Sequence, residues 1–269
     1  MATPLSSLTN NASKTPFLEL SDHKHPCVYR PSQLARMPLL YPTRRLTGEE
    51  LDEQLASGRR RSGAFVYYTA CPTCTSCEPT RLEVQGFGLS RSMKRVLQTG
   101  NRHLESRVGP PCDDATRLKL FNLHRKERNL ASSNEAYSFE DFHGFLVETC
   151  CDSYEMSFWD QETLVACSIV DCGQQSVSAV YTFFDPTYTR LSPGTYSILK
   201  QIEWATLQGR RYLYLGMFVA DNQHLRYKAR FTPQERFIDG VWVSFSQPLE
   251  DWSSSLDPAV PISNKQAKE

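Results

Sequence analysis

The sequence predicts an α+β protein in which a mixed β-sheet is flanked by helices. In the second half, three strand-length segments follow one another with only tight turns between them, and a helix then leads to a further strand. Such a meander makes antiparallel neighbours, whereas a strand–helix–strand unit makes a parallel pair, so one sheet contains both. Hydrophobic residues make up 40% of the 269 residues, which is enough for a packed core and excludes wholesale disorder.

Charge and cysteine usage narrow the class of protein. Lys and Arg number 30, as do Asp and Glu, so the formal net charge is zero and any nucleic-acid contact needs a local basic patch. No apolar run approaches the roughly 18 residues that span a bilayer, and residues 1–14 have no signal-peptide core. We therefore expect a cytoplasmic protein that binds no membrane. Its nine cysteines are expected to be thiols or metal ligands rather than a disulfide framework.

The length predicts one large or two modest domains. A Gly-Pro-Pro sequence at residues 109–111 interrupts regular secondary structure and marks the expected domain boundary. We expect a smaller N-terminal α/β domain with a Cys-rich loop at 21–110 and a C-terminal domain at 111–250. Polar residues predict flexible tails at 1–20 and 251–269.

In the N-terminal half, an acidic start with spaced leucines predicts a helix over Gly48–Leu55. Ser90 is a favourable helix cap, and a Thr-Gly-Asn sequence after Gln98 is a typical stop, so a second helix is expected between them. β-branched and aromatic residues predict strands at Ala64–Tyr68 and Thr80–Phe87, with the Cys-rich loop between them.

The C-terminal half has clearer periodicity. Asp113 or Asp114 caps a predicted helix that runs to about Asn129, and Ser138 opens an acidic capping box with Asp141. The remaining elements are predicted from strand-length apolar runs, turn residues and helix stops. They are strands at Tyr154–Trp159, Leu164–Asp171, Val177–Phe184, Tyr212–Val219 and Arg236–Phe245, and helices at Thr195–Leu207 and His224–Ala229.

Short motifs in both halves resemble one family. The first half contains Cys27-x-Tyr29, Cys71-Pro-x-Cys74-x-x-Cys77-x-Pro79-x-Arg81 and Ser90-Arg91-Ser92-x-x-Arg95. The second contains Tyr181-Thr-Phe-Phe-Asp185-Pro, Gly194-Thr195, Tyr212-Leu-Tyr214-Leu-Gly216 and Tyr227-Lys228-x-x-Phe231-x-Pro233. Together they resemble the aminoacyl-tRNA–protein transferases, and among these the bacterial aspartate/glutamate leucyltransferases, whose relatives are the eukaryotic arginyltransferases. The element order also resembles the N-acetyltransferase-like (GNAT) fold, which implies an active cleft between two splayed central strands.

The resemblance implies transfer of leucine from Leu-tRNA to the α-amino group of acceptor proteins with N-terminal Asp or Glu, which marks them for N-end rule degradation. Arg-tRNA remains an alternative donor, because donor choice depends on the shape of a pocket. The donor ester is already activated, so the reaction needs alignment, a proton acceptor and oxyanion donors, and no cofactor is required for the transfer. The sequence also has no P-loop and no G-x-G-x-x-G motif.

Substrate binding calls for cations and phosphate-binding groups. Arginine suits the acceptor carboxylate because its planar fork makes two parallel hydrogen bonds. The expected carboxylate-binding residues are Arg81, Arg91 and Arg95, although a solvated basic helix face is the alternative for the last two. The expected tRNA-binding residues are Ser90, Ser92, Lys94, Gly194 and Thr195, with further basic clusters at 59–61 and 125–128 and at Arg102.

Four residues are expected to take part in the reaction. Asp185, at the end of an aromatic strand, is the expected proton acceptor, with a turn-opening role as the alternative. Alternation along the strand sends Tyr181 toward the cleft, and Tyr214 and Lys228 come from the next strand and helix. The predicted catalytic residues are therefore Tyr181, Asp185, Tyr214 and Lys228.

The cysteine run is the sharpest isolated signal. Cys71, Cys74 and Cys77 place three thiols on one loop, and Cys27 offers a fourth. Zinc and iron–sulfur clusters both accept such a set, while inert thiols are the alternative.

Two other functions remain less favoured. A coenzyme A-dependent N-acetyltransferase would need a glycine-rich phosphate loop, whereas Arg190–Tyr196 holds one glycine. A zinc-ribbon nucleic-acid-binding protein would need a second cysteine pair, and Cys112 stands by itself downstream.

Overall fold

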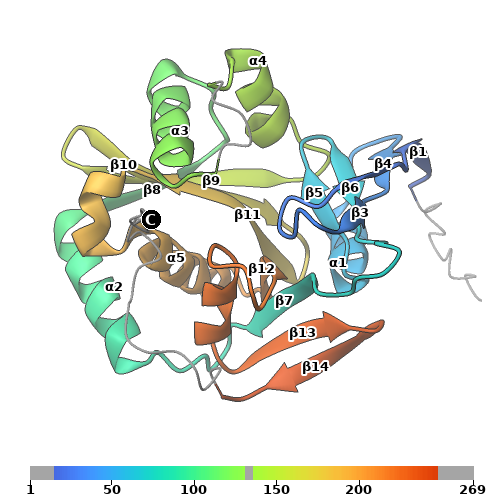
Figure 1. Cartoon of the computed structure of the whole chain (residues 1–269). Coiled ribbons are helices and arrows are strands. Elements are labelled where there is room, and N and C mark those ends of the chain that lie inside the picture. Colours follow the sequence, from blue (N-terminus) through green and yellow to red (C-terminus); the bar gives the residue numbers. More distant parts are fainter. Residues whose placement is uncertain (1–14, 131–135, 248–269) are drawn as a thin grey trace, which may run out of the picture.

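The computed structural model describes residues 15–130 and 136–247, so the predicted tail at 251–269 and most of that at 1–20 lie outside the described residues. A large mixed sheet forms the centre of the molecule, with the strand order β14-β13-β7-β12-β11-β10-β9-β8 (Figure 1). Its strands are β7 (Glu78–Glu83), β8 (Glu105–Gly109), β9 (Ser153–Asp160), β10 (Thr163–Cys172), β11 (Ser176–Phe184), β12 (Tyr212–Phe218), β13 (Gln234–Ile238) and β14 (Val241–Phe245).

The centre of the sheet has the predicted mixed connectivity. β9, β10 and β11 form an antiparallel meander, and the crossover through α5 (Pro193–Leu207) makes β12 parallel to β11. The pairing of these two parallel strands extends only from Ser176 opposite Tyr212 to Ser178 opposite Tyr214. Beyond that point β11 and β12 diverge.

Helices cover both faces of the sheet (Figure 1). On one face, α5 and α2 (Arg91–His103) pack over a core that includes Leu82, Val177 and Leu213. On the other face, α3 (Ala115–Glu127), α4 (Phe139–Phe142) and a π-helical turn η1 (His143–Val147) pack over a second core around Phe121 and Phe183. The expected caps are present, because Asp114 accepts from Arg117 N–H and Ser138 forms its capping box with Asp141.

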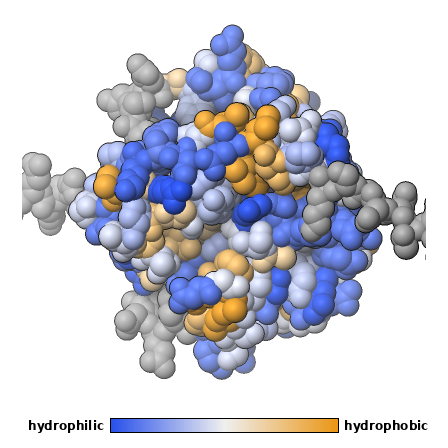
Figure 2. All heavy atoms as spheres, turned by 90° about the vertical axis from the view of Figure 1, so that its right-hand side faces the viewer, coloured by the Kyte–Doolittle hydropathy of each residue, from blue (hydrophilic) through white to orange (hydrophobic). Residues whose placement is uncertain are grey.

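The N-terminal strands form a small sheet of their own beside the large one. Its order is β1-β4-β6-β5, with β1 (Phe17–Ser21), β4 (Leu39–Pro42), β5 (Arg60–Ser62) and β6 (Phe65–Tyr67), next to a hairpin of β2 (Lys24–Pro26) and β3 (Leu34–Arg36). The predicted helix α1 (Gly48–Ala56) begins with a capping box at Thr47. Figure 2 looks onto this side, where hydrophilic surface separates two hydrophobic areas.

The structure differs from the predicted elements in several places. Phe17–Ser21 is a strand rather than tail, because it pairs with β4. The Gly-Pro-Pro break does not divide two sheets, since β7 and β8 from the predicted N-terminal domain are strands of the large sheet. The predicted strand Arg236–Phe245 is a hairpin, turning at Asp239 and Gly240, both with positive φ. The predicted helix near His224 is a short 3₁₀ helix, η3 (Arg226–Arg230).

The helix α2 runs past its predicted stop. Gly100 lies inside it, where a Cβ atom would approach the Tyr196 ring to 2.3 Å. The glycine therefore permits close packing of α2 on α5 rather than ending the helix. Within 15–130 and 136–247, no helix is long and apolar enough to cross a membrane.

Candidate active site

The divergence of β11 and β12 is filled by a cationic side chain from the N-terminal sheet. Arg60 of β5 is 6% exposed, and its Nη2 donates a 2.7 Å hydrogen bond to the carbonyl of Ala179, just past the last paired residue of β11. On the opposite strand, Gly216 interrupts the register of β12 with φ +88°. A Cβ atom at Gly216 would lie 3.4 Å from Arg60 Nη2.

Lys228 of η3 lies against the same glycine. Its Cε would be 3.8 Å from a Cβ at Gly216, and the side chain is 4% exposed. Burial, with the charge of Arg60 as the second cause, lowers the pKa of Lys228 to about 7. A substantial fraction of this amine is therefore neutral near neutral pH, and it can accept a proton. Lys228 was predicted as catalytic, and the structure places it at the strand divergence.

Tyr67 of β6 lies near Arg60, and Tyr181 lies on β11 beyond the point of divergence. Tyr67 of β6 is buried, and burial raises its pKa. Burial likewise raises the pKa of Tyr181, to about 12, so both hydroxyls stay protonated near neutral pH. The ring of Tyr181 packs on Phe121, with 5.5 Å between the ring centres. Its hydroxyl is also close enough to Tyr29 to raise the pKa of that residue.

His124 of α3 supports the end of β11. The N–H of Phe184 donates to His124 Nδ1 at 3.2 Å, and the imidazole lies 4.4 Å from the Phe184 ring. Burial, followed by the charge of Arg128, lowers the pKa of His124 to about 4. It is therefore neutral at physiological pH and acts as a fixed hydrogen-bonding support of the strand.

Arg81 does not join the predicted carboxylate clamp. Its Nε pairs with Glu235 at 2.6 Å, its Nη1 donates to the hydroxyl of Tyr214 at 3.2 Å, and its guanidinium lies 4.1 Å from the ring centres of both Tyr212 and Trp242. These contacts engage the guanidinium group of Arg81 within the protein. They also occupy the hydroxyl of Tyr214, which was predicted as catalytic.

The other predicted clamp residues lie on the opposite face of the sheet. Arg91 and Arg95 are exposed on α2, as is Lys94, and α2 packs over the face to which Leu82 points. Alternation along β7 sends Arg81 to the other face. The three arginines therefore cannot grip one carboxylate, and the solvated basic face is the better interpretation of α2.

Two predicted tRNA-binding serines cap or neighbour the start of that helix. Ser90 Oγ accepts from the N–H of Met93 at 3.2 Å, and the hydroxyls of Ser90 and Ser92 are 3.0 Å apart. Ser90 thus has a structural role as the N-cap of α2.

Asp185 has the turn-opening role that was its alternative. Its Oδ1 accepts from the N–H and the hydroxyl of Thr187, at 2.8 and 2.7 Å. This caps the short 3₁₀ helix η2 (Pro186–Leu191). Gly194 and Thr195 lie in the first turn of α5, where no side chain makes a capping hydrogen bond.

The cysteines gather without forming a ligand set. Burial, followed by the nearby Cys27, Cys71 and Cys74 thiols, raises the pKa of Cys77 to about 12. Arg30 donates to the sulfur of Cys74 at 3.7 Å and pairs with Asp221. In residues 15–130 and 136–247, however, no three His, Cys, Asp or Glu side chains are arranged to hold a metal ion. The predicted metal or cluster on Cys27, Cys71, Cys74 and Cys77 stays a prediction.

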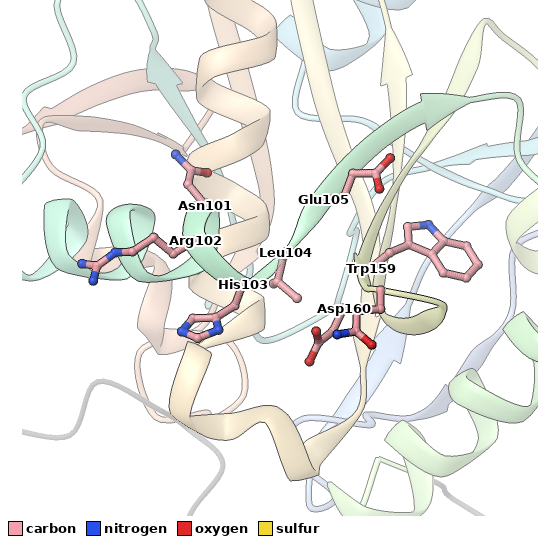
Figure 3. Close-up of a pocket in the computed structure, with 8 residues that line it drawn as sticks. Asn101, Arg102, His103, Leu104, Glu105, Trp159 and Asp160 are labelled. Carbon is pink, nitrogen blue, oxygen red and sulfur yellow. The ribbon is translucent and has the colours of Figure 1, made fainter.

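Figure 3 shows a cavity of about 530 Å³ at the C-terminal end of α2. It is lined by Asn101, Arg102, His103, Leu104, Glu105, Trp159, Asp160 and Gln161. Asn101 accepts a 2.9 Å hydrogen bond from the hydroxyl of Tyr196, in the first turns of α5. This hydrogen bond connects one lining residue to α5, and the lining includes the predicted basic residue Arg102.

Sequence reasoning missed Arg60 and the support given by His124. The run 59–61 was interpreted as a surface patch for phosphates, whereas Arg60 and Arg61 are both buried. The turn at Gly63, between β5 and β6, was the signal available: a hairpin would have directed alternate arginines inward.

Comparisons with known proteins show which proteins this chain is similar to. Residues 116–238 match the family model described as "Arginine-tRNA-protein transferase, C terminus", and residues 25–95 match its N-terminal counterpart. A protein of Acinetobacter baumannii named aspartate/glutamate leucyltransferase is 36% identical over 84% of this chain and 83% of its own. One of that name from Thiobacillus denitrificans is 32% identical over 81% and 91%. The solved structure of L-PGS from Bacillus licheniformis covers 53% of this chain and 45% of its own, at 14% identity and a TM-score of 0.41.

Proposed function

This chain belongs to the arginine-tRNA-protein transferase family, and from that premise we propose that it transfers leucine from Leu-tRNA to the α-amino group of proteins with N-terminal Asp or Glu. It is an aminoacyltransferase by family. The leucine donor and the acidic acceptors are supported by the names of relatives that share 32–36% of its residues over most of the chain. By extension, the acceptors are marked for N-end rule degradation.

The observation that carries the chemical part of this proposal is the place of Lys228. Its amine is buried beside Gly216, at the divergence of β11 and β12, and its pKa is lowered to about 7. The acceptor's α-amino group has a reference pKa of about 7.7–8.0, so an amine with a similar pKa can take up its proton. We assign the proton-accepting role to Lys228 instead of Asp185, whose carboxylate caps η2.

The proposed reaction balances without a further reagent. The α-amino nitrogen attacks the ester carbonyl carbon, and Lys228 takes the proton that the nitrogen loses. The bond between that carbon and the ribose oxygen of the tRNA then breaks, and a peptide bond remains. The departing oxygen takes up the proton held by Lys228, so that the amine is restored for the next turnover.

The donor tRNA is expected to approach from the side of α5. The N-cap residue Ser192 makes no side-chain capping hydrogen bond, and the cavity with Arg102 and Trp159 lies at the end of α2, which packs on α5. Backbone N–H groups and an arginine suit phosphate, and an indole offers a stacking surface for a base. We propose that Gly194 and Thr195 face the tRNA, and the GNAT-type cleft stays a prediction.

A direct assay tests the function. The purified chain is mixed with tRNA charged with labelled leucine or arginine and with peptides that begin with Asp, Glu or Lys. We expect label on the Asp and Glu peptides from Leu-tRNA. Labelling from Arg-tRNA instead would identify the alternative donor, and acetylation from acetyl-coenzyme A without tRNA use would refute the proposal.

A further inference from the structure

Arg60 is a buried cation that lacks an anionic partner. Within the described residues, its guanidinium makes one hydrogen bond, to the carbonyl of Ala179, and its buried Nη1 has no hydrogen-bond partner. The next residue shows the contrast: Arg61 is equally buried, but its Nε lies 2.8 Å from Asp171. Among residues 15–130 and 136–247, a carboxylate therefore pairs with Arg61 and none pairs with Arg60.

This arrangement favours an anion from outside the chain. A buried, unpaired charge with an unused donor is unfavourable, and the cost is relieved when a ligand supplies the missing acceptor. The planar fork of an arginine matches a carboxylate, which it binds through two parallel hydrogen bonds. Lys228, against the same Gly216, adds positive charge to this position whenever its amine is protonated.

The position of Arg60 beside Lys228 favours the side-chain carboxylate of the acceptor's first residue as its ligand. In an N-terminal Asp or Glu, the α-amino group and the side-chain carboxylate are separated by only a few bonds. A Cβ atom at Gly216 would lie 3.4 Å from Arg60 Nη2 and 3.8 Å from Lys228 Cε, so the two side chains are near neighbours and a single acceptor residue can contact both. A tRNA phosphate lies on a bulky polymer backbone and is a poorer match for a site that is 6% exposed.

We propose that Arg60 binds the side-chain carboxylate of the acceptor's N-terminal residue and thereby selects acidic acceptors. This proposal rests on the proposed function. It replaces the clamp of Arg81, Arg91 and Arg95, of which the first is already paired and the other two lie across the sheet. The carboxylate holds the acceptor with its α-amino group toward Lys228.

Arg60→Met, of similar length and without charge, tests the proposal. With Leu-tRNA held constant, kcat/KM is measured for peptides that differ only in Asp or Asn at the first position. We expect the variant to lose about ten- to hundredfold on the Asp peptide, which is the usual effect of losing a charge-assisted hydrogen bond, and little on the Asn peptide. The preference for Asp over Asn then largely disappears. Arg211→Met is the matched control, because Arg211 is exposed and pairs with Glu83 at 2.9 Å.

A binding measurement separates this proposal from the function. Without tRNA, the Asp peptide is expected to raise the thermal midpoint of the wild type more than the Asn peptide does, and this difference should vanish in Arg60→Met. If Arg60→Met loses the difference in thermal midpoint between the Asp and Asn peptides, the carboxylate-binding role of Arg60 is supported. If the wild type also shows no transfer, only the proposed function fails. If Arg60→Met keeps the preference for the Asp peptide, Arg60 does not bind the acceptor carboxylate. Transfer of leucine by the wild type would still support the proposed function.

Two further outcomes test whether Arg60 binds the acceptor carboxylate. If Arg60→Met weakens tRNA binding and slows both peptides equally, Arg60 serves a phosphate and the proposal is wrong. If Arg60→Met does not fold, Arg60→Lys is used, since it keeps the charge and loses the fork. We expect it to retain part of the Asp preference, and an unchanged preference would refute a bidentate role.

Discussion

At the scale of single residues, we expect the reaction to depend on the ionisation of Lys228, the proposed base. A base acts only when deprotonated, so its contribution falls as the pH drops below its pKa of about 7. Lys228→Met is expected to lower kcat/KM by about 10²–10⁴-fold, the usual contribution of a positioned base. In the pH profile of kcat/KM, the step near pH 7 should disappear, while the step due to the acceptor amine remains.

Lys200→Met is the matched control for this variant. Lys200 pairs with Glu203 along α5, away from the strand divergence, so its loss should leave the profile unchanged. A Lys228→Met protein that keeps both steps and its turnover would show that the proton leaves by another route.

Asp185 gives the opposite prediction. Because its carboxylate holds the N–H and hydroxyl of Thr187, Asp185→Ala should lower the free energy of unfolding by about 0.5–2 kcal/mol, the usual cost of a lost cap. Turnover per folded molecule should remain close to that of the wild type. Urea unfolding and the transfer assay measure the two effects separately, and a collapse of turnover in a stable protein would restore Asp185 as the base.

At the scale of elements, the packing of α2 on α5 depends on Gly100. Helix propensity predicts that Gly100→Ala would stabilise an exposed helix by about 1 kcal/mol. The Cβ atom would, however, lie 2.3 Å from the Tyr196 ring, and overpacking of this kind costs about 1–3 kcal/mol. We expect net destabilisation in urea unfolding, with the exposed Gln98→Ala as control. A more stable Gly100→Ala protein would mean that the two helices separate at little cost.

The same glycine shows what the sequence could predict. Periodicity and caps found the meander, α3 and α5, because these elements are determined by local patterns and by a single buried face. The sequence around Gly100 is compatible both with a helix end and with close packing of an aromatic ring against the helix. Only the packing of Tyr196, which is distant in sequence, distinguishes the two.

The site was predictable to a similar extent. Lys228 was predicted through a motif, whereas Arg60 was assigned to a surface patch, because a run of three arginines has no apolar residue to reveal a strand. Its burial follows from the pairing of β5 with β6 and from the position of both beside β11, which are long-range facts. The Asp239-Gly240 turn, by contrast, was a local hairpin signal that reasoning about one long strand overlooked.

At the scale of the whole molecule, the two halves of the chain share one sheet. β7 pairs with β12 on one side and with β13 on the other, and β8 covers the edge of β9. The buried pair of Arg61 and Asp171 also links the N-terminal strands to β10. Removal of one partner of a buried ion pair typically costs about 3–5 kcal/mol, so this contact couples the two sheets strongly.

A fragment of residues 111–250, the predicted C-terminal domain, is therefore expected not to fold by itself. Without β7, the strands β12 and β13 have lost the strand that joins them, and Leu82 and Val84 are missing from the core beneath α5. Residues 15–247, which keep every described element, should instead unfold in one cooperative transition like the full chain. Circular dichroism during urea unfolding compares the two. A sharp transition in the fragment would mean that the Gly-Pro-Pro break does separate two independent folding units, and that the shared sheet contributes little to cooperativity.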